Sequence, residues 1–169
     1  MKKTFFIITI TLFLSHTIFA QTKKVTNQNS QTQTIFSKSY DYVNDYEKIL
    51  SPSQITGLKN TLKSCESNSG HKIIIVTTSS IIPYANIPEY ALYLNTYLSN
   101  KLKMNAAVLI VLSKDLRQIQ LQASNQIGNK LNYDETREII SNFALPEFKK
   151  GDFHKGLEKA VAQIIVKLK

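Results

Sequence analysis

Blocks of hydrophobic and polar residues predict strands and helices in turn along most of the chain. Two continuous aliphatic runs, 72–78 and 106–112, predict strands that are buried on both faces of a sheet. Residues 117–123 alternate between polar and apolar positions, which predicts a half-exposed edge strand. The connection 113–116 is short enough for a hairpin between the last two strands.

A strong helix start signal stands at Ser51, where an N-cap serine is followed by Pro52 and Gln54. This helix should end within 67–70, and residues 42–43 should form a short extended piece before it. Helical spacing of apolar residues predicts three further helices, over residues 88–102, 134–143 and 152–167.

Strands that alternate with helices predict an α/β fold with a small, mostly parallel sheet covered on both sides. The hairpin would add an antiparallel edge. Ligands of such folds bind beyond the carboxyl ends of the strands. Here those ends are residues 77–80 and 113–115.

The first residues have the three parts of a secretory signal. Lys2 and Lys3 precede an apolar run over 5–14, and Ala20 offers a cleavage site with Gln21 as the mature start. The alternative is a retained membrane anchor, but the run is short for a span of about 20 residues. We therefore expect an exported protein, periplasmic or secreted, with residues 1–20 removed and no stable membrane span in the mature form.

Composition limits the partners of the mature chain. Residues 21–39 are rich in Gln, Asn and Thr and predict a flexible polar spacer, which leaves 40–169 as one domain. The formal charge is +9, but no Arg-rich stripe with interleaved aromatic residues is present. We expect no nucleic acid partner.

The standard catalytic motifs are missing. The chain has only five glycines and no phosphate-binding glycine-rich loop, Gly-x-Ser-x-Gly elbow or His-Glu-x-x-His motif. Cys65 is the one cysteine, so an internal disulfide and a multi-cysteine zinc site are excluded. Its helical spacing from Leu58 and Leu62 predicts a small buried apolar residue.

Three aspartates, Asp45, Asp115 and Asp134, fall in expected loops or at a helix start. Oxygen ligands from loops can hold Ca²⁺ or Mg²⁺, which makes these residues a candidate metal cleft. The alternative is that Asp45 and Asp134 cap turns and helices and that Asp115 solvates a hairpin.

Two further patterns leave a choice between packing and binding. Tyr90, Tyr93 and Tyr97 form a second stripe on their helix, which predicts packing rather than a binding patch. The last helix is basic and amphipathic, with an apolar stripe that includes Val161 and Ile164. We expect this stripe to pack on the sheet, although such helices can also lie on anionic membranes.

Several segments, in this order, resemble the TPM domain family over residues 40–169. Residues 43–46 and 49–52 resemble the opening of the family's domain, and residues 72–78 resemble its first core strand. Residues 89–91 resemble the start of its second helix, and 106–112 with Asp115 and Arg117 resemble its central hairpin. The closest match is 145–153, followed by Gly156 and Leu157.

The resemblance implies a three-layer α/β/α sandwich. The family includes thylakoid-lumen proteins of photosystem repair, nematode receptor auxiliary proteins and bacterial envelope proteins. Some members are described as acid phosphatases, and some bind a divalent metal in an acidic cleft. Candidate polar residues of the corresponding cleft in this chain are Thr78, Ser79, Asn105 and Arg117.

The sequence departs from the family pattern where that chemistry would lie. The family's Asp-Asn-Gly before the central strand reads 104–106 Met-Asn-Ala, and the family's Glu after the hairpin falls on Gly128. Asp45 carries over cleanly, whereas Asp115 and Asp134 match approximately. We therefore expect a non-catalytic envelope factor that binds or maintains a membrane-protein complex; the alternative is a metal-assisted acid phosphatase.

Overall fold

A computed structural model describes residues 35–169 of the chain. The compact unit discussed below comprises Ser39–Lys169. The predicted signal sequence, 1–20, and residues 21–34 of the predicted spacer lie outside the described residues. Over 35–169, no helix is both long and apolar enough to cross a membrane.

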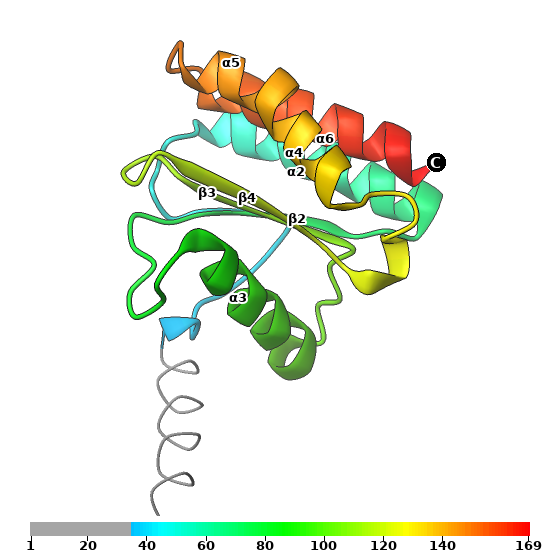
Figure 1. Cartoon of the computed structure of the whole chain (residues 1–169), viewed down its shortest axis with the longest axis horizontal. Coiled ribbons are helices and arrows are strands. Elements are labelled where there is room, and N and C mark those ends of the chain that lie inside the picture. The colour runs from blue at the N-terminus through cyan, green and yellow to red at the C-terminus, as the bar shows by residue number, and fades with distance from the viewer. Residues whose placement is uncertain (1–34) are drawn as a thin grey trace, which may run out of the picture. The chain divides into compact units, whose positions relative to one another are not determined.

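One four-stranded sheet forms the centre of the unit (Figure 1). Its strands lie in chain order: β1 (Val43–Asp45), β2 (Ile73–Thr77), β3 (Val108–Ser113) and β4 (Gln118–Ala123). β1, β2 and β3 are parallel, and β4 returns antiparallel to β3 in a hairpin. The predicted α/β class, the mostly parallel sheet and the antiparallel edge hairpin are confirmed.

Helices cover both faces of the sheet, which gives the three layers expected (Figure 1). α3 (Ile87–Leu102) covers one face alone. The other face carries α2 (Pro52–Ser69), α4 (Tyr133–Ile139) and α6 (Phe153–Leu168). The predicted start of α2 is confirmed, because Ser51 and Gln54 form a reciprocal capping box and Gly70 ends the helix with φ of 72°.

The third predicted helix ends later than its expected boundary of 143. After α4 the chain stays helical through a π-helical turn, Ile140–Ala144, and then α5 (Leu145–Phe148). Pro146 lies in the first turn of α5, where a missing N–H costs no helical hydrogen bond. The N-cap of α4 is Asn132, so Asp134 lies inside the first turn and is not the cap.

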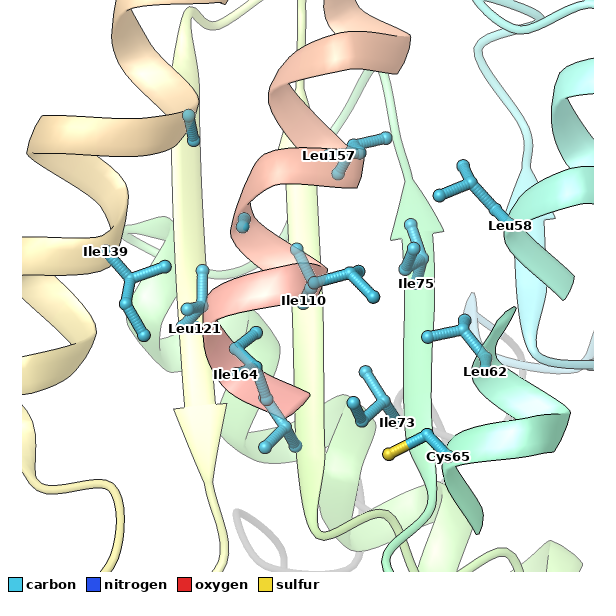
Figure 2. Packing of buried hydrophobic residues seen from close by; sticks show 14 of the residues in the cluster. Leu58, Leu62, Cys65, Ile73, Ile75, Ile110, Leu121, Ile139, Leu157 and Ile164 are labelled. Atoms are coloured by element: carbon cyan, nitrogen blue, oxygen red, sulfur yellow. The ribbon is translucent and has the colours of Figure 1, made fainter. Parts of the chain in front are cut away.

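The two faces of the buried strands belong to two apolar layers, because successive side chains of a strand point to opposite faces. Ile73, Ile75 and Ile110 pack toward α2 and α6, where Leu62 and Leu157 meet them (Figure 2). The alternate positions of β2 and β3 are equally buried and face α3. Every residue of β2 and β3 is buried, as predicted for both strands.

A buried carboxylate joins α5 to α6. Glu147 is 4% exposed, and its carboxylate accepts hydrogen bonds from Lys159 Nζ at 2.5 Å and Lys150 Nζ at 3.2 Å. Its backbone oxygen also accepts from the amides of Lys150 and Asp152. Asp152 then caps α6 by accepting from the amide of Lys155. These contacts give structural roles to three polar side chains of the segment 145–153, those of Glu147, Lys150 and Asp152.

Candidate functional site

Asp45, the last residue of β1, accepts hydrogen bonds from the turn that follows it and from the end of β2. Its Oδ1 accepts from Thr77 Oγ1 at 2.7 Å and from the amide of Ile49 at 3.2 Å, and its Oδ2 accepts from the amide of Leu50 at 2.8 Å. The side chain thus closes the turn between β1 and α2 and ties it to the end of β2. This arrangement supports the turn-capping alternative for this residue.

Glu47 continues this network to the hairpin. Its amide donates to Thr77 Oγ1 at 3.0 Å, and its carboxylate accepts from the amides of Lys114 and Asp115 at 3.0 and 3.2 Å. A carboxylate on two consecutive backbone N–H groups is a charge-assisted contact. Glu47 therefore links the carboxyl ends of β1, β2 and β3, where ligands of α/β folds bind.

Thr78 and Ser79 follow β2 at this same edge. Thr78 is buried, donates its amide to the oxygen of Leu112 at 3.0 Å and donates its hydroxyl to the oxygen of Ser80 at 2.8 Å. Ser79 is exposed. Of these two hydroxyl groups, only that of Ser79 is therefore accessible from solvent.

The hairpin turn carries Asp115 and Arg117, and both side chains are exposed. The turn is closed by the amide of Arg117, which donates to the oxygen of Lys114 at 3.1 Å, with Arg117 at φ of 54°. Asp115 and Asp45 thus lie at one edge of the sheet, connected through Glu47.

Asp134 lies at the opposite end of the unit. Its neighbour Glu135 pairs with Lys167 in the last turn of α6 at 2.7 Å, whereas Phe153 in the first turn lies 5.8 Å from Lys114 Nζ, beside Asp115. The rise of α6 between these two contacts is about 21 Å. The structure does not bring Asp134 together with Asp45 and Asp115.

Asn105 is also remote from the carboxyl edge, the edge of the sheet where the carboxyl ends of β1, β2 and β3 meet. It precedes β3, at the amino ends of the parallel strands, and its Oδ1 accepts from Ser99 Oγ at 2.7 Å. The polar candidates therefore divide between the two ends of the sheet.

The fit of these residues to a Ca²⁺ or Mg²⁺ ion follows from their hydrogen bonds. Asp45 and Glu47 already accept five hydrogen bonds from protein groups, whereas Asp115 in the hairpin turn is exposed. Within 35–169, no three His, Cys, Asp or Glu side chains gather as a metal site would require. The three predicted aspartates do not form one ligand set, and metal binding by any of them stays a prediction.

Tyrosines gather beside the carboxyl edge, on the α3 side. Tyr84 lies edge-on to Tyr90 with ring centroids 5.6 Å apart and stacks on Tyr93 at 5.1 Å. Tyr40 and Tyr46 form another edge-on pair at 5.9 Å. Burial, with Tyr90 nearby, raises the pKa of Tyr46 to about 12, so its hydroxyl stays protonated at neutral pH. The predicted packing role agrees with these contacts for Tyr90, which is 4% exposed, and for Tyr93, which stacks at the rim.

Sequence reasoning did not single out Glu47 or Glu147. Glu47 lies two residues after Asp45, the last residue of β1. Its place directly after a strand was the only sequence signal that could have marked it as a candidate, because the carboxyl ends of parallel strands meet at one edge of the sheet. Glu147 is followed closely by Lys149 and Lys150 in the sequence and looks like a solvated residue, although its main partner is Lys159, on the next helix. Only the packing of α5 on α6 reveals that pair.

Solved structures of low sequence identity share this fold. The N-terminal domain of a protein from P. gingivalis is 22% identical with a TM-score of 0.67, and the match covers 81% of this chain and 87% of that one. The BA42 protein from Bizionia argentinensis is 18% identical with a TM-score of 0.58, covering 73% and 83%. The N-terminal domain of a Corynebacterium glutamicum protein is 18% identical with a TM-score of 0.54, covering 76% and 80%.

No curated protein matches the chain. At 18–22% sequence identity, the similar solved structures show the fold of this chain and nothing about its function. The model of the TPM domain matches residues 43–167, from the first residue of β1 to the last turn of α6. With the four strands and both helical layers inside this match, the chain belongs to the TPM domain family.

Proposed function

We propose that this protein is a non-catalytic factor of the cell envelope that binds or maintains a membrane-protein complex. It would act after export, in the periplasm or outside the cell. Its N-terminal sequence supports export, because Lys2, Lys3 and the apolar run 5–14 have the composition of a secretory signal.

The main support for a non-catalytic role is how Asp45 and Glu47 are used. Their carboxylates hold the turns that follow β1 and β3 through hydrogen bonds with backbone amides and Thr77. Metal-assisted phosphate hydrolysis needs several groups to place the metal, the attacking water and the phosphate charge. In the hairpin turn this leaves the exposed carboxylate of Asp115, which is a small set for that task.

Phosphatase activity is the alternative, and one assay separates the two functions. Protein purified from cells that express the full chain is incubated with p-nitrophenyl phosphate and with Mg²⁺, Ca²⁺ or EDTA. We expect no metal-dependent turnover. Turnover that requires metal and is lost in Asp45→Asn, but kept in Asp134→Asn at the other end of the unit, would overturn the proposal.

Partner binding is tested directly by cross-linking in intact cells and affinity purification from the envelope fraction. We expect a membrane protein to be recovered with the tagged protein in stoichiometric amount. An untagged culture and a tagged, unrelated exported protein are the controls. If only abundant envelope proteins common to the controls are recovered, the binding role is contradicted.

A further inference from the structure

A groove between α2 and α6 lies away from the carboxyl edge of the sheet. Its volume is about 810 Å³, within the range of ligand sites. Cys65, Ile165 and Leu168 contribute apolar surface to it, and Cys65 and Leu168 are themselves buried parts of the core. Side chains from α2 form its polar wall. The groove thus offers an apolar strip beside a row of hydrogen-bonding groups.

The polar wall has a regular repeat. Asn60, Ser64 and Asn68 line the groove at four-residue intervals on α2, and all three are exposed. Their side chains make no hydrogen bond within the described part of the chain. Successive members are separated by a rise of about 6 Å along the helix. Two amides and a hydroxyl therefore stand in a line, free to donate and to accept.

This repeat matches an extended polypeptide. A strand advances about 6.6–6.8 Å every two residues and presents an N–H and a C=O group to the same side at that interval. The groups at 60, 64 and 68 could meet alternate residues of one bound segment. The intervening side chains would then lie on the apolar strip.

A cation at the groove selects the charge of the segment. Lys130 lines the groove, is half-buried and donates from Nζ to the oxygen of Leu168 at 3.0 Å. Within 35–169 its ammonium makes no ion pair, although other lysines of the helical layer pair with Glu135 and Glu147. Two of its three N–H donors remain for a ligand. An ammonium near apolar surface favours a carboxylate on the bound segment.

We infer that the groove between α2 and α6 binds an extended segment of a partner protein that places a carboxylate on Lys130. This inference rests on the proposed function and names the surface through which the partner is held. The segment spans about four residues, because the line from Asn60 to Asn68 rises about 12 Å and a strand advances about 3.3 Å per residue.

The test is selection of a displayed library of random seven-residue peptides on protein purified from cells expressing the full chain. Selected peptides are synthesised and titrated against the protein and its variants. We expect peptides rich in Asp or Glu, with binding at least tenfold weaker when Asp is replaced by Asn. Lys130→Gln should weaken binding by the same factor, and Lys130→Arg should not.

Ser64→Arg should block the groove, whereas Ser67→Arg makes the same change at an exposed position of α2 that does not line it. Thermal unfolding of each variant checks the fold. The inference is overturned if no peptide is enriched, if the enriched peptides bind Ser64→Arg as well as the parent, or if they bind Lys130→Gln as well as the parent. Recovery of the envelope partner by Ser64→Arg would leave the proposed function standing and reject this groove as its site.

Discussion

Gly156 of α6 lies directly against the ring of Phe148 of α5. A Cβ atom at Gly156 would lie 2.2 Å from Cε1 of that ring and 2.9 Å from the backbone oxygen of Ala144. No heavy atom keeps such distances, so the two helical segments can approach only where α6 lacks a side chain. Phe148 also stacks on Phe153 with ring centroids 5.5 Å apart, which further restricts the ring.

Gly156→Ala should therefore destabilise the protein by about 1–3 kcal/mol, the usual cost of inserting a methyl group into a packed site. An alanine in a helix normally gains roughly 0.5–1 kcal/mol over glycine. Gly57→Ala in α2 is the matched control, because nothing lies within 4 Å of its Cβ position, and it should be stabilising. Urea unfolding measures both. Equal shifts in the two variants would contradict the contact.

Asp45 allows a second test, of a structural role against a metal-binding role. Asp45→Ala removes the acceptor for Thr77 Oγ1 and two amides and should cost about 1–3 kcal/mol without any added metal. Asp115→Ala, at an exposed side chain of the same edge, should change stability by less than about 0.5 kcal/mol. The free energy of unfolding is measured with EDTA and with Ca²⁺. A loss for Asp45→Ala that appears only with Ca²⁺ would assign this carboxylate to a metal.

Element types were predictable because local signals dominate them. The capping residues at Ser51 and the continuous apolar runs of β2 and β3 specify their elements without tertiary help. The length of the helical segment after 133 was not predictable, because Pro146 is compatible with either a break or a new first turn. The packing of Phe148 on Gly156 favours the second.

The placement of the layers was less accessible from sequence. Strands β1, β2 and β3 advance in one direction, yet α2 and α3 cross on opposite faces (Figure 1). Two crossovers of that kind have opposite hands, and right-handed connections are the strong general rule. Applied to this strand order, the rule would put both helices on one face. Burial of every β2 and β3 residue required cover on both faces but did not say which helix supplied it.

The candidate site was predictable in its location but not in its membership. The strand ends after β2 and β3 were expected to form one edge, and Asp45 and Asp115 do lie there. Asp134 was grouped with them because it was expected at a helix start and matched the family pattern approximately, although its helix begins at the other end of the sheet. Because β4 runs antiparallel to β3, the chain leaves β4 at the amino ends of the parallel strands, so the predicted hairpin itself implied that Asp134 lies away from Asp45 and Asp115.

The pH dependence of stability should report the ion pair between the buried Glu147 and the exposed Lys159. The hydrogen bond from Lys159 holds the pKa of Glu147 below its usual value. A carboxyl with a lowered folded-state pKa contributes stability above its unfolded pKa of about 4.3, and this contribution is lost as pH falls through the folded-state value. As the pH falls below about 5, the free energy of unfolding of the parent should therefore decrease more than that of Glu147→Gln.

Urea unfolding at a series of pH values, from roughly 7 down to 3, measures this difference. Glu138→Gln, at an exposed side chain of α4, is the control and should follow the parent closely. Parallel pH profiles for the parent and Glu147→Gln would show that the pair contributes nothing to the pH dependence.

The apolar stripe of α6 provides the last prediction. Val161 is 1% exposed and lies in the core between Leu157 and Ile164, whereas Val166 on the same helix is 61% exposed. Val161→Asp loses the packing of a core side chain, roughly 2–5 kcal/mol, and also buries a carboxyl group without a partner. Domains of this size have about 5–15 kcal/mol of stability in total, so this variant should be largely unfolded.

Val166→Asp introduces the same carboxylate five residues along the helix and should change the free energy of unfolding by less than about 0.5 kcal/mol, because its side chain already faces solvent. Circular dichroism and urea unfolding in lipid-free buffer compare the two, and sedimentation with anionic vesicles tests membrane binding. If Val161→Asp unfolds like the parent and loses only vesicle binding, the stripe serves a membrane surface. Unfolding of Val161→Asp alone, without any lipid, requires that the stripe stabilise the domain by packing on the sheet.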